Sequence, residues 1–328
     1  MFPSGLSMLW ESTEPQGALR DRFGLDSFDE AVSWLTKVLS EVWAIEAVAC
    51  ERIIISDNNA IAWVRTDQAV LTDQEGLVVK WSRAQEQFDK FAATAELIDA
   101  LHAQGVPVAP PRASVDGELR VIVNSGPWPL SMTVQPAIEA DLLDTSDETA
   151  VRAAGACLAT LHHALATHQD SRLAGCTTGS EQEQSLHQRI ETWLESHDAG
   201  LAPAASERLR DHLTSLPAID VAPQLIHNDY RASNVLTKAS EVVAVLDFDE
   251  VGRDYCVIDL ANAFVLLSTR FTKWQPTPAG VRETFLEGYQ SVRPLGPLER
   301  QWLEVLVLWR GIIAIPPGED PAGWANAV

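Results

Sequence analysis

Five side chains in the second half of the chain have types and spacing that suit proton transfer beside a bound cation. His227, Asp229 and Asn234 form the pattern His-x-Asp-x-x-x-x-Asn, and Asp247 and Asp249 follow in the triplet Asp-Phe-Asp. A carboxylate such as Asp229 can accept the proton of a hydroxyl nucleophile. Asn234 and Asp247, with Asp249 as the alternative, offer the hard oxygen ligands that Mg²⁺ prefers. The pattern therefore predicts a general base next to a magnesium site.

The residues between the two motifs indicate how these side chains could meet. A polar turn at residues 238–241 precedes the apolar segment 242–246, which predicts an antiparallel hairpin. If the hairpin closes in the middle of that turn, Asn234 lies opposite about Val245, two residues before Asp247. Both candidate ligands would then lie at one end of a rigid ribbon. The alternative interpretation is a buried polar loop beside an ordinary hairpin.

The spacing of the first motif is that of a kinase catalytic loop, and the chain around it resembles the superfamily of aminoglycoside phosphotransferases and choline kinases. Three further matches follow the order of the family: Val-Val-Lys at 78–80, Leu-Ala-Thr-Leu-His at 158–162 and Asp-Leu-Ala at 259–261. Together the matches cover about residues 50–265. The resemblance implies an α+β, two-lobed, protein-kinase-like fold and an ATP- and Mg²⁺-dependent small-molecule kinase.

The length of 328 residues suits two lobes better than one small core. We expect an N-terminal cap at residues 1–50, a nucleotide-binding lobe with an antiparallel sheet at 51–138, and a mostly helical lobe with the catalytic loop and acceptor pocket at 139–328. Ser27 and Glu30 fit a capping box at a helix start. Apolar periodicity and turn residues predict helices at 27–42 and 85–103, strands at 52–56, 60–66, 69–72, 77–81, 119–123 and 131–135, and a loop between helices at 200–205.

The composition indicates a globular protein without an anionic macromolecular partner. Hydrophobic residues make up 46% of the chain and charged residues 21%. The formal net charge of −22 argues against nucleic acid and anionic membranes as partners, because both require a basic face. The four cysteines form no Cys-x-x-Cys pair, so neither a disulfide framework nor a zinc site is indicated.

No targeting or membrane segment is predicted. The first ten residues lack the basic start and apolar core of a signal peptide. The longest apolar run, at residues 302–315, contains two charges and is too short to span a bilayer. We therefore expect a cytoplasmic protein that is a monomer or a homodimer.

Lys80 is the predicted nucleotide lysine, because it ends an apolar strand from which its ammonium group can reach the phosphates. A lone lysine on a strand is usually only an exposed side chain, so this role depends on its order along the chain. The family normally adds a glutamate from the next helix, but Thr94 occupies the aligned position. Glu86 is the preferred substitute, because it lies eight residues earlier near the same helical face, whereas Glu96 lies on another.

Two short backbone segments are expected to meet the rest of the nucleotide. No Gly-x-Gly-x-x-Gly precedes the second predicted strand, so the turn 56–59 is the candidate to cover the phosphates, through its N–H groups and Asn59. A plain hairpin turn is an equally good interpretation. The connection between the lobes is expected at residues 134–137, where the backbone around Val134 and Pro136 would meet adenine.

Other polar residues near the catalytic motif have expected supporting roles. In loops of this kind, His227 is expected to hold the backbone by packing and hydrogen bonding. His162 lies within a predicted helix and is expected to be structural, and Asp259 is expected to tie the loop to the next helix. Arg231, two residues after the predicted base, would either pair with the transferring phosphate or brace Asp229.

The acceptor pocket is expected from residues 180–220 and 262–328, which the family uses for it. Glu304 and Arg310 interrupt an apolar helix, where charges are costly unless they are paired or face a cleft. Their spacing of six residues is poor for pairing within a helix. Trp309 is expected to stack on the acceptor ring, although tryptophans at helical spacing are more often part of the core.

The general appearance of the chain is similar to actinobacterial glucosamine kinases and maltokinases, in its N-terminal cap and its Asn-Asp-Tyr-Arg sequence. This similarity implies phosphorylation of a hydroxyl on an amino sugar such as glucosamine, whose ammonium group would pair with carboxylates including Asp229 and Glu304. An aminoglycoside kinase, a kinase of another small amino alcohol and a neutral-sugar kinase remain open. So does a pseudokinase that binds nucleotide without transfer.

Overall fold

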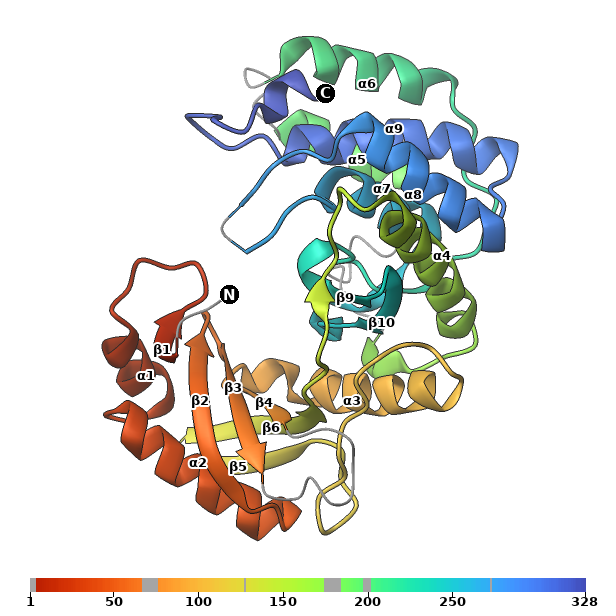
Figure 1. The fold of residues 1–328 in the computed structure, drawn as a ribbon. Helices are drawn as coiled ribbons and strands as arrows, with labels where there is room; N and C mark the ends of the chain where they lie inside the picture. Colours follow the sequence, from red (N-terminus) through yellow and green to blue (C-terminus); the bar gives the residue numbers. More distant parts are fainter. Residues whose placement is uncertain (1–3, 67–75, 127, 174–183, 197–201, 272) are drawn as a thin grey trace. The chain divides into compact units, whose positions relative to one another are not determined.

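Two compact units make up the computed structural model, which describes residues 4–66, 76–126, 128–173, 184–196, 202–271 and 273–328 (Figure 1). The first unit comprises Met1–Glu139 and the second Ala140–Val328. The boundary lies one residue beyond the expected end of the nucleotide-binding lobe. The N-terminal 50 residues belong to the first unit and do not form a unit of their own.

In the described part of the first unit, a six-stranded sheet has the strand order β1-β2-β3-β4-β6-β5. Neighbouring strands are antiparallel except β1 and β2, which pair in parallel. The predicted antiparallel sheet is thus confirmed, whereas β1 was not predicted, because residues 1–25 lack a strand pattern. The predicted strand 69–72 lies outside the described residues. The strands are β1 (Gly5–Met8), β2 (Ala47–Ile55), β3 (Asn59–Thr66), β4 (Gly76–Ser82), β5 (Val121–Ser125) and β6 (Trp128–Pro136).

Two N-terminal helices, α1 (Pro15–Phe23) and α2 (Phe28–Trp43), pack their apolar sides against this sheet. As predicted, α2 begins at Ser27, whose side chain accepts a hydrogen bond from the Glu30 N–H at 3.2 Å. The Glu30 carboxylate accepts from the N–H of Asp26 at 2.7 Å. This return bond reaches one residue further back than in the predicted capping box.

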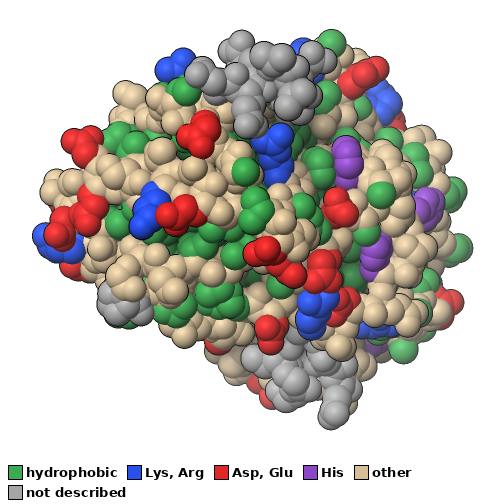
Figure 2. Space-filling view, turned by 90° about the horizontal axis from the view of Figure 1, so that it is seen from below, with side chains coloured by type: hydrophobic (Ala, Val, Ile, Leu, Met, Phe, Trp, Pro, Cys, Tyr) green, Lys and Arg blue, Asp and Glu red, His purple; other side chains and the backbone are tan. Residues whose placement is uncertain are grey.

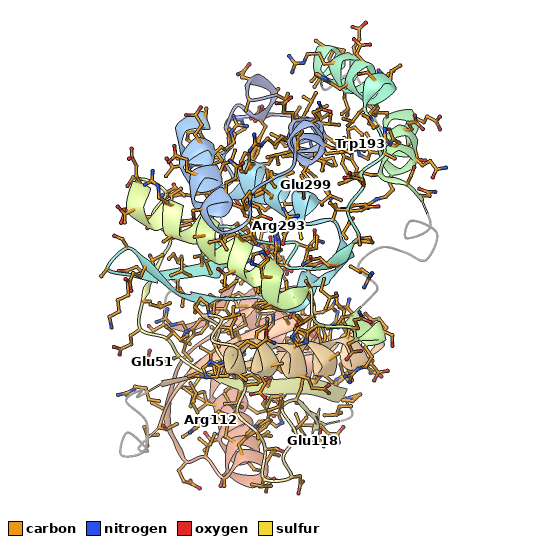
Figure 3. All side chains as sticks on the ribbon, turned by 90° about the vertical axis from the view of Figure 1, so that its right-hand side faces the viewer. Glu51, Arg112, Glu118, Trp193, Arg293 and Glu299 are labelled. Carbon is orange, nitrogen blue, oxygen red and sulfur yellow. The ribbon has the colours of Figure 1, made fainter. Side chains whose placement is uncertain are left out.

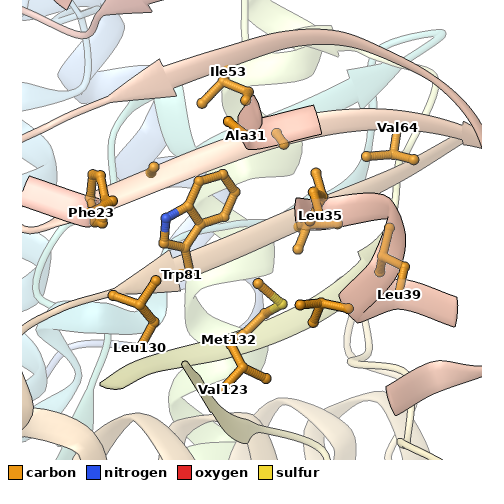
Figure 4. Close-up of a cluster of buried hydrophobic side chains, with 14 of the residues drawn as sticks. Phe23, Ala31, Leu35, Leu39, Ile53, Val64, Trp81, Val123, Leu130 and Met132 are labelled. Carbon is orange, nitrogen blue, oxygen red and sulfur yellow. The ribbon is translucent and has the colours of Figure 1, made fainter. Parts of the chain in front are cut away.

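Trp81 of β4 lies at the centre of the core between these helices and the sheet (Figure 4). Its indole is fully buried, and the rings of Phe23 and Trp34 meet it edge to face at centroid distances of 6.0 and 5.6 Å. Leu35 of α2 and Leu130 of β6 belong to the same cluster. Burial of each large apolar side chain contributes roughly 1.5–3 kcal/mol, so this core fixes α1 and α2 to the sheet.

The predicted helix 85–103 consists of two parts. A 3₁₀ turn, η1 (Gln85–Gln87), precedes the α-helix α3 (Phe88–Ala103). The helix ends where predicted, because Gly105 adopts a left-handed conformation with φ of 81° that favours glycine. The change from 3₁₀ to α winding alters the direction of side chains before residue 88 relative to those after it.

The second unit is mainly helical, as predicted, and its described residues also form two small sheets. One has the strand order β10-β9-β7 and the other pairs β11 with β8. Residues 203–205, predicted as loop, begin α6, because a proline suits the first position of a helix. The strands are β7 (Asp141–Leu142), β8 (Gln224–Ile226), β9 (Val235–Lys238), β10 (Glu241–Val245) and β11 (Gly252–Asp254). The helices are α4 (Glu148–Leu165), α5 (Leu186–Ser196), α6 (Pro203–Ser215), α7 (Cys256–Leu266), α8 (Ala279–Val292) and α9 (Pro297–Ile313).

Helices α4 and α8 approach each other so closely that glycine is required at their contact. A Cβ atom added to Gly155 of α4 would lie on the carbonyl oxygen of Phe285. A Cβ atom added to Gly288 of α8 would lie on the carbonyl oxygen of Arg152. Since backbone atoms cannot give way as side chains can, any larger residue at either position must separate the helices.

The β9–β10 hairpin confirms the predicted turn but has a different register. Ala239 and Ser240 form the turn, both with positive φ, of 51° and 65°. A β-bulge between Val242 and Ala244 shifts the strands, so Val245 pairs with Val235. Asn234 therefore lies opposite Leu246, whose N–H donates to its carbonyl at 2.8 Å, one residue closer to Asp247 than predicted.

The charged side chains on the face in Figure 2 are mostly acidic, and the basic ones are separated from one another. This distribution agrees with the net charge of −22. No helix in the described residues combines the length and the apolarity needed to cross a membrane.

Candidate active site

The catalytic-loop motif connects β8 to β9, and His227 holds its backbone in place. The His227 ring is fully buried; its Nδ1 accepts a hydrogen bond from the Asp229 N–H at 3.2 Å, and its Nε2 donates to the Leu246 carbonyl at 2.9 Å. Its ring also packs edge to face against Phe248 at 4.7 Å. His227 thus joins the loop to the residues that precede Asp247, which confirms the predicted supporting role.

Asp259 of α7 anchors the backbone of the same loop. Its buried carboxylate accepts hydrogen bonds from the N–H groups of His227 and Asn228, both at 2.8 Å, and from His162 Nε2 at 3.0 Å. Burial alone would raise the pKa of Asp259, but the hydrogen bond and charge of His162 outweigh it and lower that pKa. The left-handed conformation of Asn228, with φ of 67°, turns its N–H group toward this carboxylate. The predicted tie between loop and helix is therefore confirmed.

His162 of α4 forms the inner end of this buried network. Its Nδ1 lies 2.8 Å from the Tyr289 hydroxyl, and its Nε2 donates to Asp259. Burial opposes a positive charge on the ring, but Tyr289, Cys256 and the hydrogen bond to Asp259 raise the pKa of His162 well above its ordinary value. His162 is therefore a structural residue of this buried network, in agreement with its predicted role.

Asp229 is held on both of its carboxylate oxygens. Asn234 Nδ2 donates to Oδ2 at 2.7 Å and also to the Asp229 main-chain carbonyl at 2.9 Å. Arg231 Nε lies 3.0 Å from Oδ1 as an ion pair, but it is not aligned for a hydrogen bond. Burial is the largest influence and raises the pKa of Asp229; the nearby Asp247 raises it further, while Arg231 opposes the rise. The side chain remains 20% exposed, so a hydroxyl group can reach it.

Two of the candidate metal ligands, Asn234 and Asp247, lie near this carboxylate. Asn234 is buried and its amide nitrogen is engaged with Asp229, so its Oδ1, which accepts a long bond of 3.4 Å from the Ser233 hydroxyl, is the atom suited to a cation. Asp247 is exposed and adopts a left-handed conformation with φ of 61° at the start of the turn η5 (Phe248–Glu250). Asp249 lies within that turn and is half-buried.

This donor set fits a hard cation. Amide and carboxylate oxygens are ligands of the type that Mg²⁺ uses, and a cation would relieve the repulsion between Asp229 and Asp247 that raises the pKa of Asp229. Within the described ranges, no three or more His, Cys, Asp or Glu side chains form a metal cluster. The proposed site differs from such a cluster, because it consists of one amide oxygen and one or two carboxylates.

Arg231 connects Asp229 to an exposed aromatic ring. Its guanidinium lies over the indole of Trp274 at 5.8 Å from the centroid. Trp274 is 54% exposed and belongs to the segment between α7 and α8. The sequence placed this tryptophan in the acceptor region without distinguishing it from others, because only tertiary structure shows its position next to Arg231.

The predicted nucleotide residues lie in the first unit. Lys80 of β4 is flanked by Ile61 of β3 and Thr133 of β6. Asn59 pairs with Ser82 at the start of β3, and its Oδ1 is buried with no hydrogen-bond partner among the described residues.

The other three predicted nucleotide residues, Glu86, Val134 and Pro136, have different surroundings. Glu86 is exposed within η1, outside α3, so the argument from a shared helical face with Thr94 does not hold. Thr94 is buried, and its hydroxyl donates to the Lys90 carbonyl at 2.9 Å. In β6 the Val134 carbonyl accepts from the Arg112 N–H at 2.7 Å, and Pro136 ends the strand.

The three predicted acceptor residues on α9 lie in different environments. Glu304 is exposed and lines a cavity of about 150 Å³ together with Thr277 and Arg282. Trp309 is only 5% exposed, because α9 directs it into the core of the unit. The guanidinium of Arg310 also lies over its ring at 4.6 Å. The structure thus gives little support to stacking of an acceptor on Trp309.

Several known proteins are similar to this chain. The family model described as phosphotransferase enzyme family matches residues 63–303. An uncharacterised Synechocystis protein is 29% identical over 121 residues, which are 37% of this chain and only 30% of that protein.

Solved structures of small-molecule kinases share the fold. An amicoumacin kinase in complex with AMP-PNP, Ca²⁺ and its antibiotic has a TM-score of 0.60 at 17% identity, covering 95% of this chain and 92% of that one. A spectinomycin phosphotransferase in complex with ADP and spectinomycin has a TM-score of 0.59 at 14% identity, with 86% of each chain covered. A microcompartment-associated aminopropanol kinase has a TM-score of 0.58 at 17% identity, with 90% and 93% covered. The chain belongs to the phosphotransferase enzyme family, which confirms the predicted enzyme class and the kinase-like α+β fold.

Proposed function

We propose that the protein is an ATP- and Mg²⁺-dependent kinase that phosphorylates a hydroxyl group of a small polar acceptor, an amino sugar such as glucosamine. The observation that carries the proposal is the arrangement around Asp229. Both of its oxygens are held, by Asn234 and Arg231, while the side chain stays 20% exposed beside Asp247.

Asp229 is the proposed general base. Because burial raises its pKa, the carboxylate has a greater affinity for a proton than an ordinary exposed aspartate. It would orient the acceptor hydroxyl and take its proton as the hydroxyl oxygen attacks the γ-phosphorus of ATP. The bond from that phosphorus to the bridging oxygen would break, with ADP as the leaving group. Arg231 would keep Asp229 in position and turn toward the negative charge of the transferring phosphate, because its present contact is not aligned as a hydrogen bond.

Asn234 and Asp247 would hold the magnesium ion, with Asp249 as the further carboxylate. When bound, the ion neutralises negative charge on the phosphates. The protein contributes by fixing the ligands. The hydrogen bond from the Leu246 N–H to the Asn234 carbonyl fixes Asn234 opposite the residue that precedes Asp247. His227 Nε2 donates to the Leu246 carbonyl and so holds Leu246 in place. The amicoumacin kinase complex contains Ca²⁺, which supports the use of a divalent cation by a protein of this fold.

The nucleotide is assigned to the first unit. Lys80 would pair with the α and β phosphates, and the turn that ends at Asn59 would meet them through its backbone. The backbone near Val134 and Pro136 would meet adenine. Glu86 remains the proposed partner of Lys80 from the sequence. The complexes of similar structures with AMP-PNP and ADP support nucleotide binding by this fold.

An amino sugar is the favoured acceptor because acidic groups are available to its ammonium group. Asp229 is a half-buried carboxylate of the second unit whose side chain is 20% exposed, and Glu304 is an exposed one that lines a cavity. A charge-assisted hydrogen bond to an ammonium group is stronger than one to a neutral hydroxyl. Trp274 is the better placed aromatic surface for a sugar ring, because it is exposed and adjoins Arg231.

Other acceptors define the alternatives. The similar structures act on antibiotics or on aminopropanol, so an aminoglycoside kinase and a small amino-alcohol kinase are the main ones, followed by a neutral-sugar kinase. A pseudokinase would bind nucleotide without transfer. The complete set of Asp229, Asn234 and Asp247 argues against it.

The test is a screen for acceptor-dependent ADP formation. Glucosamine, N-acetylglucosamine, glucose, aminopropanol and an aminoglycoside would each be offered with ATP and Mg²⁺. We expect glucosamine to have the highest kcat/KM. Equal values for glucosamine and glucose would favour a neutral-sugar kinase, and no stimulation by any compound would favour the pseudokinase.

A further inference from the structure

Two arginines and two tryptophans form a cluster in the second unit that phosphoryl transfer does not use. Arg189 and Trp193 belong to α5, and Trp309 and Arg310 belong to α9. The indoles of Trp193 and Trp309 meet edge to face at 6.2 Å, and the Arg310 guanidinium lies over the Trp309 ring at 4.6 Å. Trp193 lies between α5 and α9 in Figure 3.

The acidic residue of the cluster, Asp254, is already satisfied by Arg189. The two side chains form a bidentate pair, with Arg189 Nη1 donating to Oδ1 at 2.9 Å and Nη2 to Oδ2 at 2.8 Å. The Tyr255 N–H also donates to Oδ1 at 2.9 Å. Both members of the pair are 13% exposed. The carboxylate therefore stabilises Arg189. The second arginine nearby, Arg310, forms no ion pair with any of the described residues, although the charges of Asp254 and Asp259 act on it.

Arg310 and its neighbour have donor groups without acceptors. Arg310 Nε and Trp309 Nε1 are inaccessible to solvent and have no hydrogen-bond partner in the described parts of the chain. Buried donors are rarely left in this state, because an unmade hydrogen bond costs stability. Burial, and then the like charge of Arg189, lower the pKa of Arg310 to about 10, although the opposite charges of Asp254 and Asp259 partly offset this effect. Arg310 as a whole is only half-buried, so a ligand has access to the side chain.

We propose that Arg310, supported by the Arg189–Asp254 pair, binds the anionic group of a ligand, either a carboxylate or a phosphate. The orphaned groups are all donors, so their complement is a group rich in acceptor oxygens. A guanidinium matches carboxylate and phosphate through its planar fork of N–H groups. Both oxygens of Asp254 are engaged by Arg189, so the Arg310 Nε–H keeps no acceptor among the described residues and is left for the ligand. This inference goes beyond the kinase proposal and does not depend on an amino-sugar acceptor.

The first test measures thermal unfolding of the full chain in increasing inorganic phosphate, with sodium chloride at equal ionic strength as the control. A ligand that binds only the folded state raises the Tm as its concentration rises. We expect phosphate to raise the Tm of the wild type but to have a smaller effect on Arg310→Met and an intermediate one on Arg310→Lys. Any phosphate bound at the nucleotide site is common to all three proteins.

Arg189→Met is the matched control within the same cluster. Without added anion, Arg310→Met should be as stable as the wild type or more stable. The substitution removes a half-buried charge that forms no ion pair with the described residues. Arg189→Met should lower the Tm, because it leaves Asp254 buried and unpaired. If Arg310→Met lowers the Tm as much as Arg189→Met does, Arg310 has a structural ion pair and the proposal is wrong.

The source of the anionic group is separated by calorimetric titration. Gluconate and glucosaminic acid carry a carboxylate that glucose and glucosamine lack. Binding of the acids, lost in Arg310→Met, would assign the site to an acidic acceptor, whereas binding of phosphate alone would assign it to a phosphate group. Equal affinities of wild type and Arg310→Met for phosphate and for both acids would overturn the proposal. None of these readouts requires phosphoryl transfer, so they remain valid if the kinase proposal fails.

Discussion

The side-chain amide of Asn234 donates hydrogen bonds both to the main-chain carbonyl of Asp229 and to its Oδ2, at 2.9 and 2.7 Å. The nitrogen of this amide thus positions the proposed base, while its oxygen is the proposed metal ligand. The two functions are coupled, because any movement of Asn234 displaces Asp229. The arrangement explains why an asparagine, with a donor nitrogen and an acceptor oxygen in one side chain, suits this position better than an aspartate.

Substitutions of Asn234 should separate its two functions. Asn234→Ala removes both and should raise the Mg²⁺ requirement as well as lower kcat. Asn234→Asp keeps a ligand oxygen but loses the donor and adds a charge beside Asp229, so Mg²⁺ should still bind while kcat falls on the order of 10²-fold. Initial rates over a Mg²⁺ titration measure both effects. Normal turnover of Asn234→Asp would show that the amide does not position the base.

Two tryptophans should respond differently to substitution. Trp274 is 54% exposed beside Arg231, so Trp274→Ala should raise the KM of the acceptor several-fold, since an aromatic contact contributes about 0.5–1.5 kcal/mol. The KM of ATP should not change. Trp309 is 5% exposed, so Trp309→Phe should lower the Tm and leave the acceptor KM unchanged. The opposite pattern in steady-state kinetics would restore Trp309 as the acceptor contact.

The buried His162–Asp259 pair predicts a pH dependence of stability. The pKa of His162 is raised in the folded state, so its contribution is complete below the ordinary histidine pKa of about 6.5 and is lost as pH rises through the folded value. The pKa of Asp259 is lowered, so its contribution is complete above the ordinary aspartate pKa of about 3.9 and is lost as pH falls through the folded value.

The difference in Tm between the wild type and His162→Gln should therefore be largest between about pH 4 and pH 6.5. It should decrease toward alkaline pH, because the wild-type ring then loses its proton and its charge. Thermal unfolding of both proteins across this range provides the measurement. A difference that increases toward alkaline pH would mean that the folded protein prefers the neutral ring.

The contact between α4 and α8 should be intolerant of a single methyl group. Gly155→Ala places a Cβ atom on the Phe285 carbonyl oxygen and should lower the free energy of unfolding by about 2–4 kcal/mol. Gly280→Ala in α8 is the matched control, because no atom lies near its added Cβ; it should be neutral or stabilise by up to about 1 kcal/mol. Chemical denaturation compares the two variants, and equal effects would mean that the helices can separate at little cost.

The catalytic loop and hairpin could be predicted because their chemistry is local. The spacing from His227 to Asn234 and the polar turn at 238–241 depend on neighbouring residues only. The bulge near Val243 could not be predicted in this way, because an extra residue in a strand is fixed by packing on both sides of the ribbon. The sequence therefore placed Asn234 opposite Val245, whereas in the structure it lies opposite Leu246, the next residue.

Predictions that relied on helical phase were less successful. Glu86 was placed on a face of α3, but it lies in a 3₁₀ turn whose winding differs from that of the helix. Trp309 was expected to stack on the acceptor ring, but it is 5% exposed whereas Trp274 is 54% exposed. The sequence does not show this difference, because the exposure of an indole depends on which helices cover it. The parallel strand β1 was missed because its pairing partner, β2, is distant in sequence.

Comparison of Asp229→Asn with the wild type tests the central claim most directly, since the amide has nearly the shape of the carboxylate but cannot take a proton from the acceptor. Nucleotide binding by calorimetry and acceptor-dependent ADP formation would be measured on the same samples. The account predicts an unchanged Kd for ATP and Mg²⁺ and a loss of turnover on the order of 10²–10⁴-fold. Turnover close to that of the wild type, with nucleotide binding intact, would contradict the assignment of Asp229 as the general base.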